Sequence, residues 1–276
     1  MAQDIFRGVI ETFMSHLRAT VRLVAFCALT CATYAALLGG AALAFPFARA
    51  RAGWRGLVFR AWAKATVALL KIRITCEGAR PRPPFLLVSN HLSYVDIIVL
   101  ASQVDCTFVA KKDVSRWPVM GLLAKSIDTI FIDRENRRDI RRVSARVERE
   151  LTEGRGVVLF AEGTSSQGAR VLPFKPGLLE LAARADFAVS YAALNYRVPA
   201  LERPPHLSVC WWGDMTFVKH LIGLFHLSEI YATLVFGSET IRGGDRKTLA
   251  SKLHAAVERE FVPVVRQEEE WILSTR

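Results

Sequence analysis

The chain has 276 residues, of which 51% are hydrophobic, so it can form one large domain or two small ones around a sizeable core. Its formal net charge of +11 favours anionic partners such as nucleic acid, an anionic membrane or a phosphorylated substrate. The mean hydropathy of +0.23 is high for a soluble nucleic-acid-binding protein and favours a lipid surface. We therefore expect membrane lipids as partners and no nucleic acid.

The N-terminal segment is the candidate membrane anchor. Residues 23–45 contain no charge and are long enough to cross a hydrocarbon core as a helix, although Gly39 and Gly40 also permit a re-entrant bend. A cleaved signal peptide is the weaker alternative, because the apolar run is too long for one. Apolar residues at helical spacing before the run predict an amphipathic helix. These residues are Ile5, Phe6, Val9, Ile10, Phe13, Met14 and Leu17.

Basic residues indicate how the anchor is oriented. A cluster of five follows the apolar run, against Arg18 and Arg22 before it, which predicts that the C-terminal bulk faces the cytoplasm, as in a bacterial inner-membrane protein. The cluster consists of Arg49, Arg51, Arg55, Arg60 and Lys64.

A second N-terminal helix is predicted at residues 54–69, where apolar side chains share one face. The pattern fits equally a helix that lies flat on lipid and one that packs on the domain. The shared face consists of Trp54, Leu57, Val58, Ala61, Trp62, Ala65 and Leu69. We assign residues 1–71 to membrane-associated helices and residues 72–276 to the catalytic domain.

From residue 72 onward, short β-rich runs alternate with helical patterns. This alternation is typical of an α/β domain with a mostly parallel or mixed central sheet flanked by helices. The predicted strands are residues 72–76, 85–89, 107–110, 129–132, 157–160, 188–195, 207–211 and 230–236. The predicted helices are residues 94–102, 137–152, 177–185 and 247–261. Active residues of such folds collect in loops just beyond strand ends.

His91 follows a predicted buried strand, and Asp96 lies in the first turn of the next helix. A carboxylate placed there can fix the tautomer of a histidine base and stabilise the imidazolium that forms. Ser93 and Asp96 also fit a capping box, so the spacing alone leaves capping and catalysis open. Because no Gly-x-Ser-x-Gly elbow occurs, we interpret His91 as a base that acts directly on an acceptor hydroxyl.

Two further polar blocks follow predicted strands, at residues 131–134 and 160–166. Together with residues 90–96, they resemble the glycerophospholipid acyltransferase family, which includes the 1-acylglycerol-3-phosphate acyltransferases. Three motifs in order, within residues 85–195, make the resemblance specific. It implies that His91 is the general base, that Asp96 supports it, and that Arg134 binds the phosphate of the acceptor.

The resemblance also implies substrate-binding roles for other residues of these blocks. Phe131, Glu162, Gly163 and Thr164 belong to the matching motifs, and Glu162 holds an acceptor hydroxyl or orders the pocket. Taken alone, residues 162–164 fit an ordinary turn, and exposed cations are commonly solvated. Lys111, Lys112 and Lys175 would meet an anionic headgroup or carrier.

The implied function is a membrane-bound lysolipid O-acyltransferase of lipid biosynthesis. It transfers a fatty acyl group from acyl-CoA or acyl carrier protein to a lysolipid hydroxyl, by default converting 1-acyl-sn-glycerol-3-phosphate to phosphatidate, with no metal and no other cofactor. Ser165 replaces the usual arginine of the third block, which removes a charge suited to phosphate, although Arg170 is a candidate replacement. Residues 162–175 and 212–216 resemble a bacterial branch that includes lyso-ornithine lipid acyltransferases, so lyso-ornithine lipid is the alternative acceptor. A non-catalytic basic membrane adaptor is the remaining hypothesis.

Overall fold

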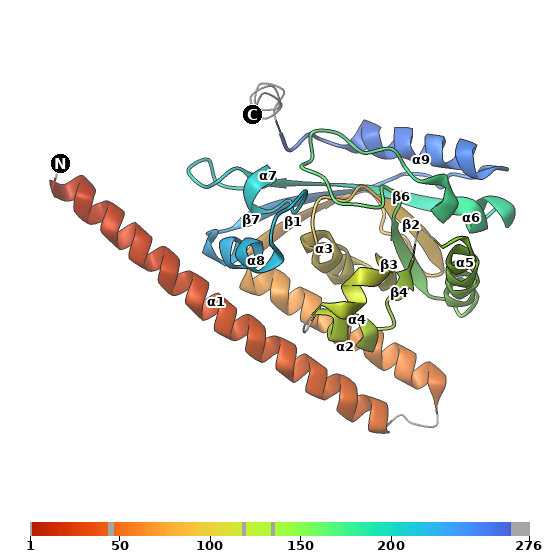
Figure 1. Ribbon diagram of the computed structural model, residues 1–276, viewed down its shortest axis with the longest axis horizontal. Coiled ribbons are helices and arrows are strands. Elements are labelled where there is room, and N and C mark those ends of the chain that lie inside the picture. The colour runs from red at the N-terminus through yellow and green to blue at the C-terminus, as the bar shows by residue number, and fades with distance from the viewer. Residues whose placement is uncertain (1, 44–46, 118–119, 134–135, 266–276) are drawn as a thin grey trace.

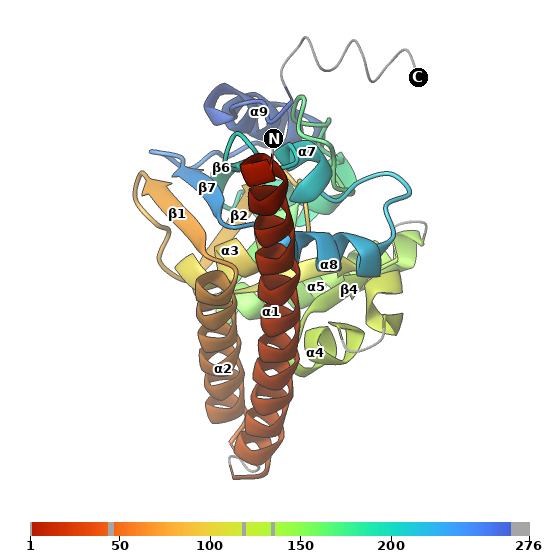
Figure 2. The same ribbon diagram turned by 90° about the vertical axis from the view of Figure 1, so that its left-hand side faces the viewer.

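The computed structural model describes residues 2–43, 47–117, 120–133 and 136–265. Its N-terminal part is a helical hairpin in which α1 (Ala2–Leu43) is followed by α2 (Ala48–Leu69), which runs back beside it (Figures 1 and 2). The bend that Gly39 and Gly40 permit does not form, because α1 continues through both glycines. Within the described chain, one helix, Thr12–Gly40 of α1, is long and apolar enough to cross a membrane by length and composition.

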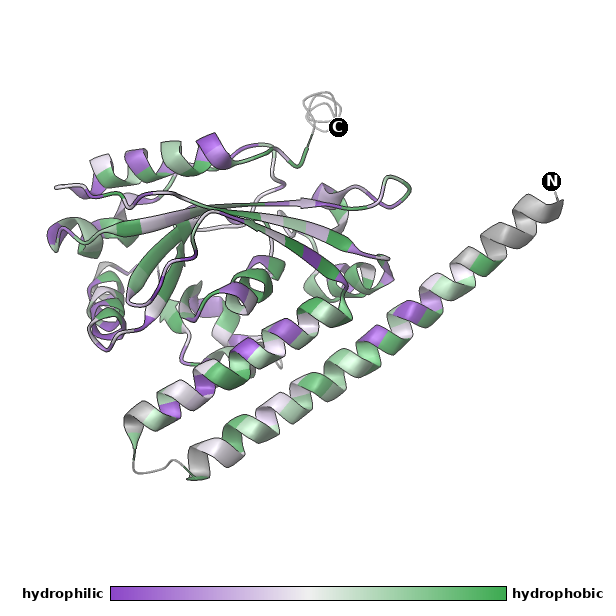
Figure 3. Ribbon diagram, turned by 180° about the vertical axis from the view of Figure 1, so that it is seen from behind, coloured by the Kyte–Doolittle hydropathy of each residue, from purple (hydrophilic) through white to green (hydrophobic). Residues whose placement is uncertain are grey.

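One face of α1 packs on the rest of the protein. Arg22 is buried and donates hydrogen bonds to the carbonyl oxygens of Phe225, Leu227 and Ser228, at or just after the end of α8 (Phe217–His226). The other face carries exposed apolar side chains, and Figure 3 shows how apolar residues prevail along this helix. The buried stripe consists of Ala19, Arg22, Phe26, Thr30, Thr33 and Leu37.

Helix α2 packs on the domain with a face different from the predicted one. Phe59 and Trp62 are buried and lie nearly parallel, with ring centroids 5.8 Å apart, whereas Leu57 is 63% exposed. The domain-packing interpretation is therefore right for Trp62, while lipid contact by the exposed side of α2 stays a prediction. The predicted face fails because Phe59, which it omits, turns toward the core together with Trp62.

The domain is built on a seven-stranded sheet with strand order β1-β7-β6-β2-β5-β3-β4. Every neighbouring pair is parallel except β6 and β7, which are antiparallel, so the predicted mixed α/β fold is confirmed. Strands β2 and β5 are wholly buried at the centre. The strands are β1 (Ile72–Glu77), β2 (Phe85–Ser89), β3 (Cys106–Lys111), β4 (Ile130–Ile132), β5 (Gly156–Phe160), β6 (Val189–Arg197) and β7 (Ile230–Phe236).

Helices cover both faces of the sheet. Figure 1 shows α9 on one face and α2, α3 and α8 on the other, while α5 and α6 lie toward the β4 end. The remaining elements are α3 (Val95–Gln103), the 3-10 helix Lys112–Arg116, α4 (Met120–Ser126), α5 (Arg137–Thr152), the 3-10 helix Pro176–Leu179, α6 (Glu180–Arg184), α7 (Pro205–Ser208) and α9 (Arg246–Glu260).

The strand predicted at residues 207–211 is wrong. Two prolines begin a short helix there, Pro205 standing in its first turn, which is a favoured position for proline. After this helix, the Trp211 N–H donates to the carbonyl oxygen of Leu92 (2.8 Å) instead of to a strand. Val209 and Cys210 are fully buried by these tertiary contacts, which explains the apolar pattern.

Candidate active site

The first and third motifs meet because their strands are neighbours. Strands β2 and β5 are parallel with Ser89 opposite Phe160, so the segments that follow both strands emerge at the same edge of the sheet. The Ser166 N–H donates to the carbonyl oxygen of His91 (3.0 Å) and joins the two segments directly. The His91 ring stacks on Phe160, with ring centroids 4.0 Å apart and planes 14° from parallel.

His91 and Asp96 form a hydrogen-bonded pair. Nδ1 of His91 lies 2.8 Å from Oδ2 of Asp96, whose side chain is fully buried, while the side chain of His91 is 19% exposed. A carboxylate accepts, so Nδ1 carries the proton and Nε2 is left as the basic nitrogen. This tautomer suits a general base that takes a proton at Nε2.

Asp96, the second residue of α3, also binds the backbone of the loop that precedes the helix. Its Oδ2 accepts from the backbone N–H groups of Leu92 (2.7 Å) and Ser93 (3.0 Å), which is one half of a capping box. The other half is missing, because the Ser93 hydroxyl has no hydrogen-bond partner among the described residues. The carboxylate thus holds the loop and the imidazole in one arrangement.

Tyr196 contacts the same carboxylate from β6. Its hydroxyl donates to Oδ1 of Asp96 (2.8 Å), and the side chain is fully buried. Burial and the charge of Asp96 raise the pKa of the Tyr196 hydroxyl well above its usual range, so it remains a donor. Sequence reasoning missed this residue, because 100 positions separate it from Asp96 and only the pairing of β2 with β6 brings them together.

Asn90 ties the first motif to the same strand. Its Nδ2 donates to the carbonyl oxygen of Leu194 (2.8 Å), and its Oδ1 accepts from the Leu194 N–H (2.7 Å). Buried amides are stable when both ends are satisfied in this way. The paired bonds place Asn90 in a structural role beside His91.

Glu162 binds the loop that carries His91. It is buried, and its Oε1 accepts from the backbone N–H of His91 (2.8 Å). Burial raises the pKa of this carboxyl to about 8, and the negative charge of Asp96 adds to the effect. Oε2 has no hydrogen-bond partner in the described part of the chain. The geometry agrees with the pocket-ordering alternative for Glu162, because it binds the His91 backbone and does not line the catalytic cavity.

An apolar cavity of about 460 Å³ opens beside His91; we call it the catalytic cavity. Gly163, Thr164 and Ser165 line it, and Gly163 has a φ of +79°, which a glycine adopts without strain. The Ser165 hydroxyl donates to the carbonyl oxygen of Trp211. The cavity extends to α2 and α4 along apolar side chains. They include Phe59, Trp62, Ile97, Ile98, Phe108, Trp117, Ile127, Trp211 and Phe217.

The other predicted site residues lie elsewhere. Arg134 lies outside the described residues. Phe131 is half-buried on β4. Lys112 is exposed, and its Nζ lies 3.6 Å from Oδ2 of Asp133. Neither residue is among the described residues that line the catalytic cavity.

Lys175 and Arg170 are exposed and also lie outside the described lining. The structure thus groups His91, Asp96, Glu162, Gly163 and Thr164. Of the three predicted lysines, Lys111 lines the cavity, whereas Lys112 and Lys175 do not.

Comparison with known proteins identifies the family of the chain. A family model described as Acyltransferase matches residues 71–194. Lyso-ornithine lipid O-acyltransferases of Rhizobium meliloti and Brucella abortus are 35% and 33% identical over 64% and 76% of this chain. The chain covers 65% of the Rhizobium protein, slightly under two thirds, and 84% of the Brucella protein.

A 1-acyl-sn-glycerol-3-phosphate acyltransferase of Neisseria gonorrhoeae is 30% identical over 69% of this chain and 76% of its own length. The crystal structure of a 1-acyl-sn-glycerophosphate acyltransferase from Thermotoga maritima has the same fold. Its TM-score is 0.57 at 19% identity, over 92% of this chain and 98% of that one. By its match with the Brucella protein and with the family model, the chain belongs to the glycerophospholipid acyltransferase family.

Proposed function

We propose that the protein is a lysolipid O-acyltransferase in which His91 is the general base. The observation that carries this proposal is a histidine whose Nδ1 is bound by a buried carboxylate and which lines an apolar cavity. Nε2 of His91 takes the proton from a lysolipid hydroxyl as that oxygen attacks the carbonyl carbon of an acyl thioester. The thioester bond then breaks, and the departing thiolate takes the proton from the His91 imidazolium.

The apolar lining fits the acyl chains. Phe59, Phe108 and Trp211 form walls without charge, and hydrocarbon is stabilised by contact with such walls. The thioester carrier is coenzyme A or acyl carrier protein. Parallel assays with the same acyl group on each carrier distinguish the two donors.

We propose lyso-ornithine lipid as the preferred acceptor. The charged residues in the described lining are Lys111 and Asp113. Nζ of Lys111 lies 2.6 Å from Oδ2 of Asp113, so the two form an ion pair. One cation and one carboxylate match the ammonium and carboxylate of an ornithine headgroup, whereas a phosphate needs an excess of cations. Ser165 adds no charge to the cavity. The Rhizobium and Brucella relatives bear the name of this activity.

Lysophosphatidate is the second candidate acceptor. Arg134 stands at the end of a motif in which family members bind phosphate, and the Neisseria relative bears the name of that activity. A site that uses Arg134 would recognise the phosphate with a bidentate cation.

We also propose that the protein attaches to the cytoplasmic face of the bacterial inner membrane. On α1, Phe13, Val21 and Val24 are 65%, 56% and 63% exposed, which gives the helix an apolar outer face. The opposite face is held against α8 by Arg22, so we propose that this half of α1 lies along the membrane surface. The basic residues after the apolar run support the cytoplasmic orientation.

An acceptor-competition assay tests the proposed function. The purified full chain in mixed micelles receives equal amounts of lyso-ornithine lipid and lysophosphatidate together with a labelled acyl thioester. We expect kcat/KM for lyso-ornithine lipid to exceed that for lysophosphatidate by about tenfold or more, because one well-placed ion pair contributes that much.

Two variants sharpen the assay. Asp113→Asn should lower the use of lyso-ornithine lipid and leave that of lysophosphatidate unchanged, whereas Ser165→Arg should raise the use of lysophosphatidate. Transfer to neither acceptor by the wild-type protein would overturn the proposed function. A preference for lysophosphatidate would overturn the choice of acceptor.

A further inference from the structure

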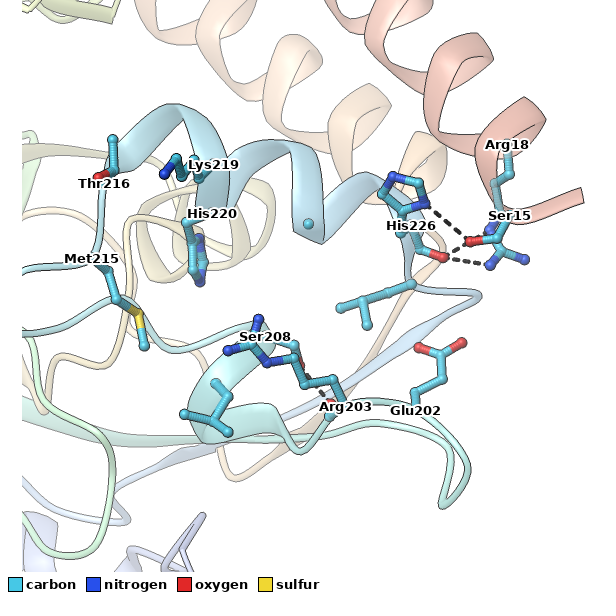
Figure 4. Close-up of a pocket in the computed structure, with 13 residues that line it drawn as sticks. Ser15, Arg18, Glu202, Arg203, Ser208, Met215, Thr216, Lys219, His220 and His226 are labelled. Atoms are coloured by element: carbon cyan, nitrogen blue, oxygen red, sulfur yellow. Dashed lines mark hydrogen bonds between the residues drawn. The ribbon is translucent and has the colours of Figure 1, made fainter. Parts of the chain in front are cut away.

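A second pocket, of about 450 Å³, lies between α1, α7 and α8; we call it the α1–α8 pocket. Figure 4 shows α8 along its upper side, α7 below, and Ser15 and Arg18 of α1 at one end. His220 lines this pocket and accepts at Nδ1 a hydrogen bond from the Tyr94 hydroxyl (2.9 Å), while Tyr94 lines the catalytic cavity. The Tyr94–His220 pair therefore stands between the two spaces.

The charges that line the α1–α8 pocket have a positive excess. Arg18, Arg203 and Lys219 contribute three cations against the carboxylate of Glu202, among the described lining residues. Arg203 and Lys219 are exposed and form no ion pair with any described residue. Glu202 accepts at Oε1 from the Ser228 N–H (2.6 Å), and its single negative charge leaves the described lining with a net positive charge.

The two histidines of the pocket do not add to this charge near neutral pH. Burial lowers the pKa of His220 to about 4, and its Nε2 donates to the carbonyl oxygen of Cys210 (3.0 Å). Burial and the neighbouring His16 and Arg18 also lower the pKa of His226. The excess therefore comes from Arg18, Arg203 and Lys219, and it attracts an anion.

Apolar side chains border the pocket on both helices. On α8, Val218 and Ile222 are 59% and 43% exposed and lie one position before Lys219 and Gly223, which line the pocket. On α1, exposed Met14 and Leu17 each precede by one position the lining residues Ser15 and Arg18. On each helix one cation, Arg18 or Lys219, thus lies next to exposed apolar side chains, as a site for an amphiphile requires.

We propose that the α1–α8 pocket binds the anionic headgroup of a membrane glycerophospholipid, whose acyl chains lie on the apolar rows of α1 and α8. This lipid is separate from the acyl acceptor at His91, and the proposal does not depend on acyl-transfer chemistry. Gly223 leaves room for the headgroup, since a Cβ added there would have no atom within 4 Å.

A lipid bound there bridges α1 and the domain. The helix already holds α8 through Arg18, whose Nε donates to the His226 carbonyl oxygen (3.1 Å), and through Ser15, whose Oγ lies 3.0 Å from Nδ1 of His226. A headgroup between Arg18, Lys219 and Arg203 adds contacts to both sides. Binding should therefore stabilise the folded protein.

Thermal unfolding of the full chain in a non-ionic detergent tests this proposal. The probes are dihexanoyl phosphatidylglycerol, dihexanoyl phosphatidylcholine and inorganic phosphate, each titrated to saturation. We expect a saturable rise of the midpoint with phosphatidylglycerol, and an apparent Kd about tenfold weaker or more for the other two probes.

Three variants separate pocket binding from general charge attraction. Lys219→Glu reverses a charge in the pocket, and Gly223→Leu fills the pocket without changing any charge; each should weaken the apparent Kd for phosphatidylglycerol by about tenfold. Lys252→Glu makes the same charge change at an exposed residue of α9, on the opposite face of the sheet. It should leave the apparent Kd within about twofold of the wild-type value.

Several results would overturn the proposal. Equal affinity for inorganic phosphate and phosphatidylglycerol would assign the pocket to a free anion. Unchanged binding in both pocket variants, or an equal loss in Lys252→Glu, would show that the lipid binds elsewhere or only through overall charge. If Gly223→Leu fails to fold, Lys219→Glu carries the test alone.

Discussion

The corner around His91 and the α1–α8 pocket are built in opposite ways. At His91, side chains and backbone groups form hydrogen bonds with one another: Asp96 alone accepts from His91, Tyr196 and two backbone N–H groups. In the α1–α8 pocket, Arg203 and Lys219 form no ion pair with a described residue. The first region is pre-organised for one proton transfer, and the second has charge available for a partner from outside. Variants at the His91 corner should change kcat. Variants of the α1–α8 pocket, or of the exposed apolar face of α1, which we call the membrane-facing region, should change the binding of lipid.

Asp96→Asn should have the largest effect among the variants that break this comparison. Asparagine keeps an acceptor oxygen for Nδ1 and the two backbone N–H groups, but it removes the carboxylate charge that stabilises the imidazolium. We expect kcat to fall by about a hundredfold, with binding to lipid vesicles unchanged. A loss smaller than about tenfold would limit Asp96 to helix capping.

Tyr196→Phe should have the next largest effect. It removes the donor to Oδ1 of Asp96 and leaves the ring in place, so we expect kcat to fall by about tenfold with KM unchanged. Tyr191→Phe is the matched control on the same strand, since the Tyr191 hydroxyl meets Arg259 and not the site. Equal effects of the two variants on kcat, or a change confined to KM, would argue against positioning of Asp96 by Tyr196.

Val24→Asp tests the membrane-facing region. Val24 is 63% exposed on the outer face of α1, and a carboxylate there opposes its burial in lipid. We expect binding to phosphatidylcholine vesicles to weaken by about fivefold, while kcat in detergent is unchanged. Val262→Asp makes the same change at a residue that is 60% exposed and follows α9. The two variants should differ; equal weakening would mean that α1 is not the contact surface.

Glu162→Gln should have the smallest effect, and it should depend on pH. Burial raises the pKa of Glu162 to about 8, above the ordinary value of 4.5. A carboxyl with a raised pKa in the folded state contributes full stability below about pH 4.5, and this contribution is lost as the pH rises through about 8. Glutamine keeps the acceptor for the His91 N–H and cannot ionise.

The measurement for Glu162 is the thermal midpoint of both proteins at about pH 5 and about pH 9. The wild-type midpoint should fall by a few degrees more than that of Glu162→Gln, since the variant lacks the ionisation. Parallel changes of the two midpoints would contradict a raised pKa for this carboxyl.

The sequence predicts best the parts that local patterns determine. Phe85–Ser89 and Ile230–Phe236 are apolar runs bounded by turn or polar residues, and both form strands with the predicted bounds. His91 and Asp96 lie within one loop and one helical turn, so a spacing of five residues suffices to place them together.

Contacts between distant segments explain what the sequence does not predict. Tyr196 reaches Asp96 only through the sheet order, and Val209 and Cys210 are buried although residues 207–211 form no strand. Helix α8 was missed, and the arginines Arg18 and Arg22, counted as markers of orientation, bind carbonyl oxygens at or just after its end. Such partners carry no signal in a single sequence.

The most direct test of the account is the rate of O-acylation of lyso-ornithine lipid by the full chain and by His91→Ala in the same mixed micelles. The account predicts that the wild-type protein forms the acylated product and that His91→Ala is slower by at least about a hundredfold, although it binds vesicles as the wild type does. A variant that keeps the wild-type rate would contradict the role of His91 as the general base.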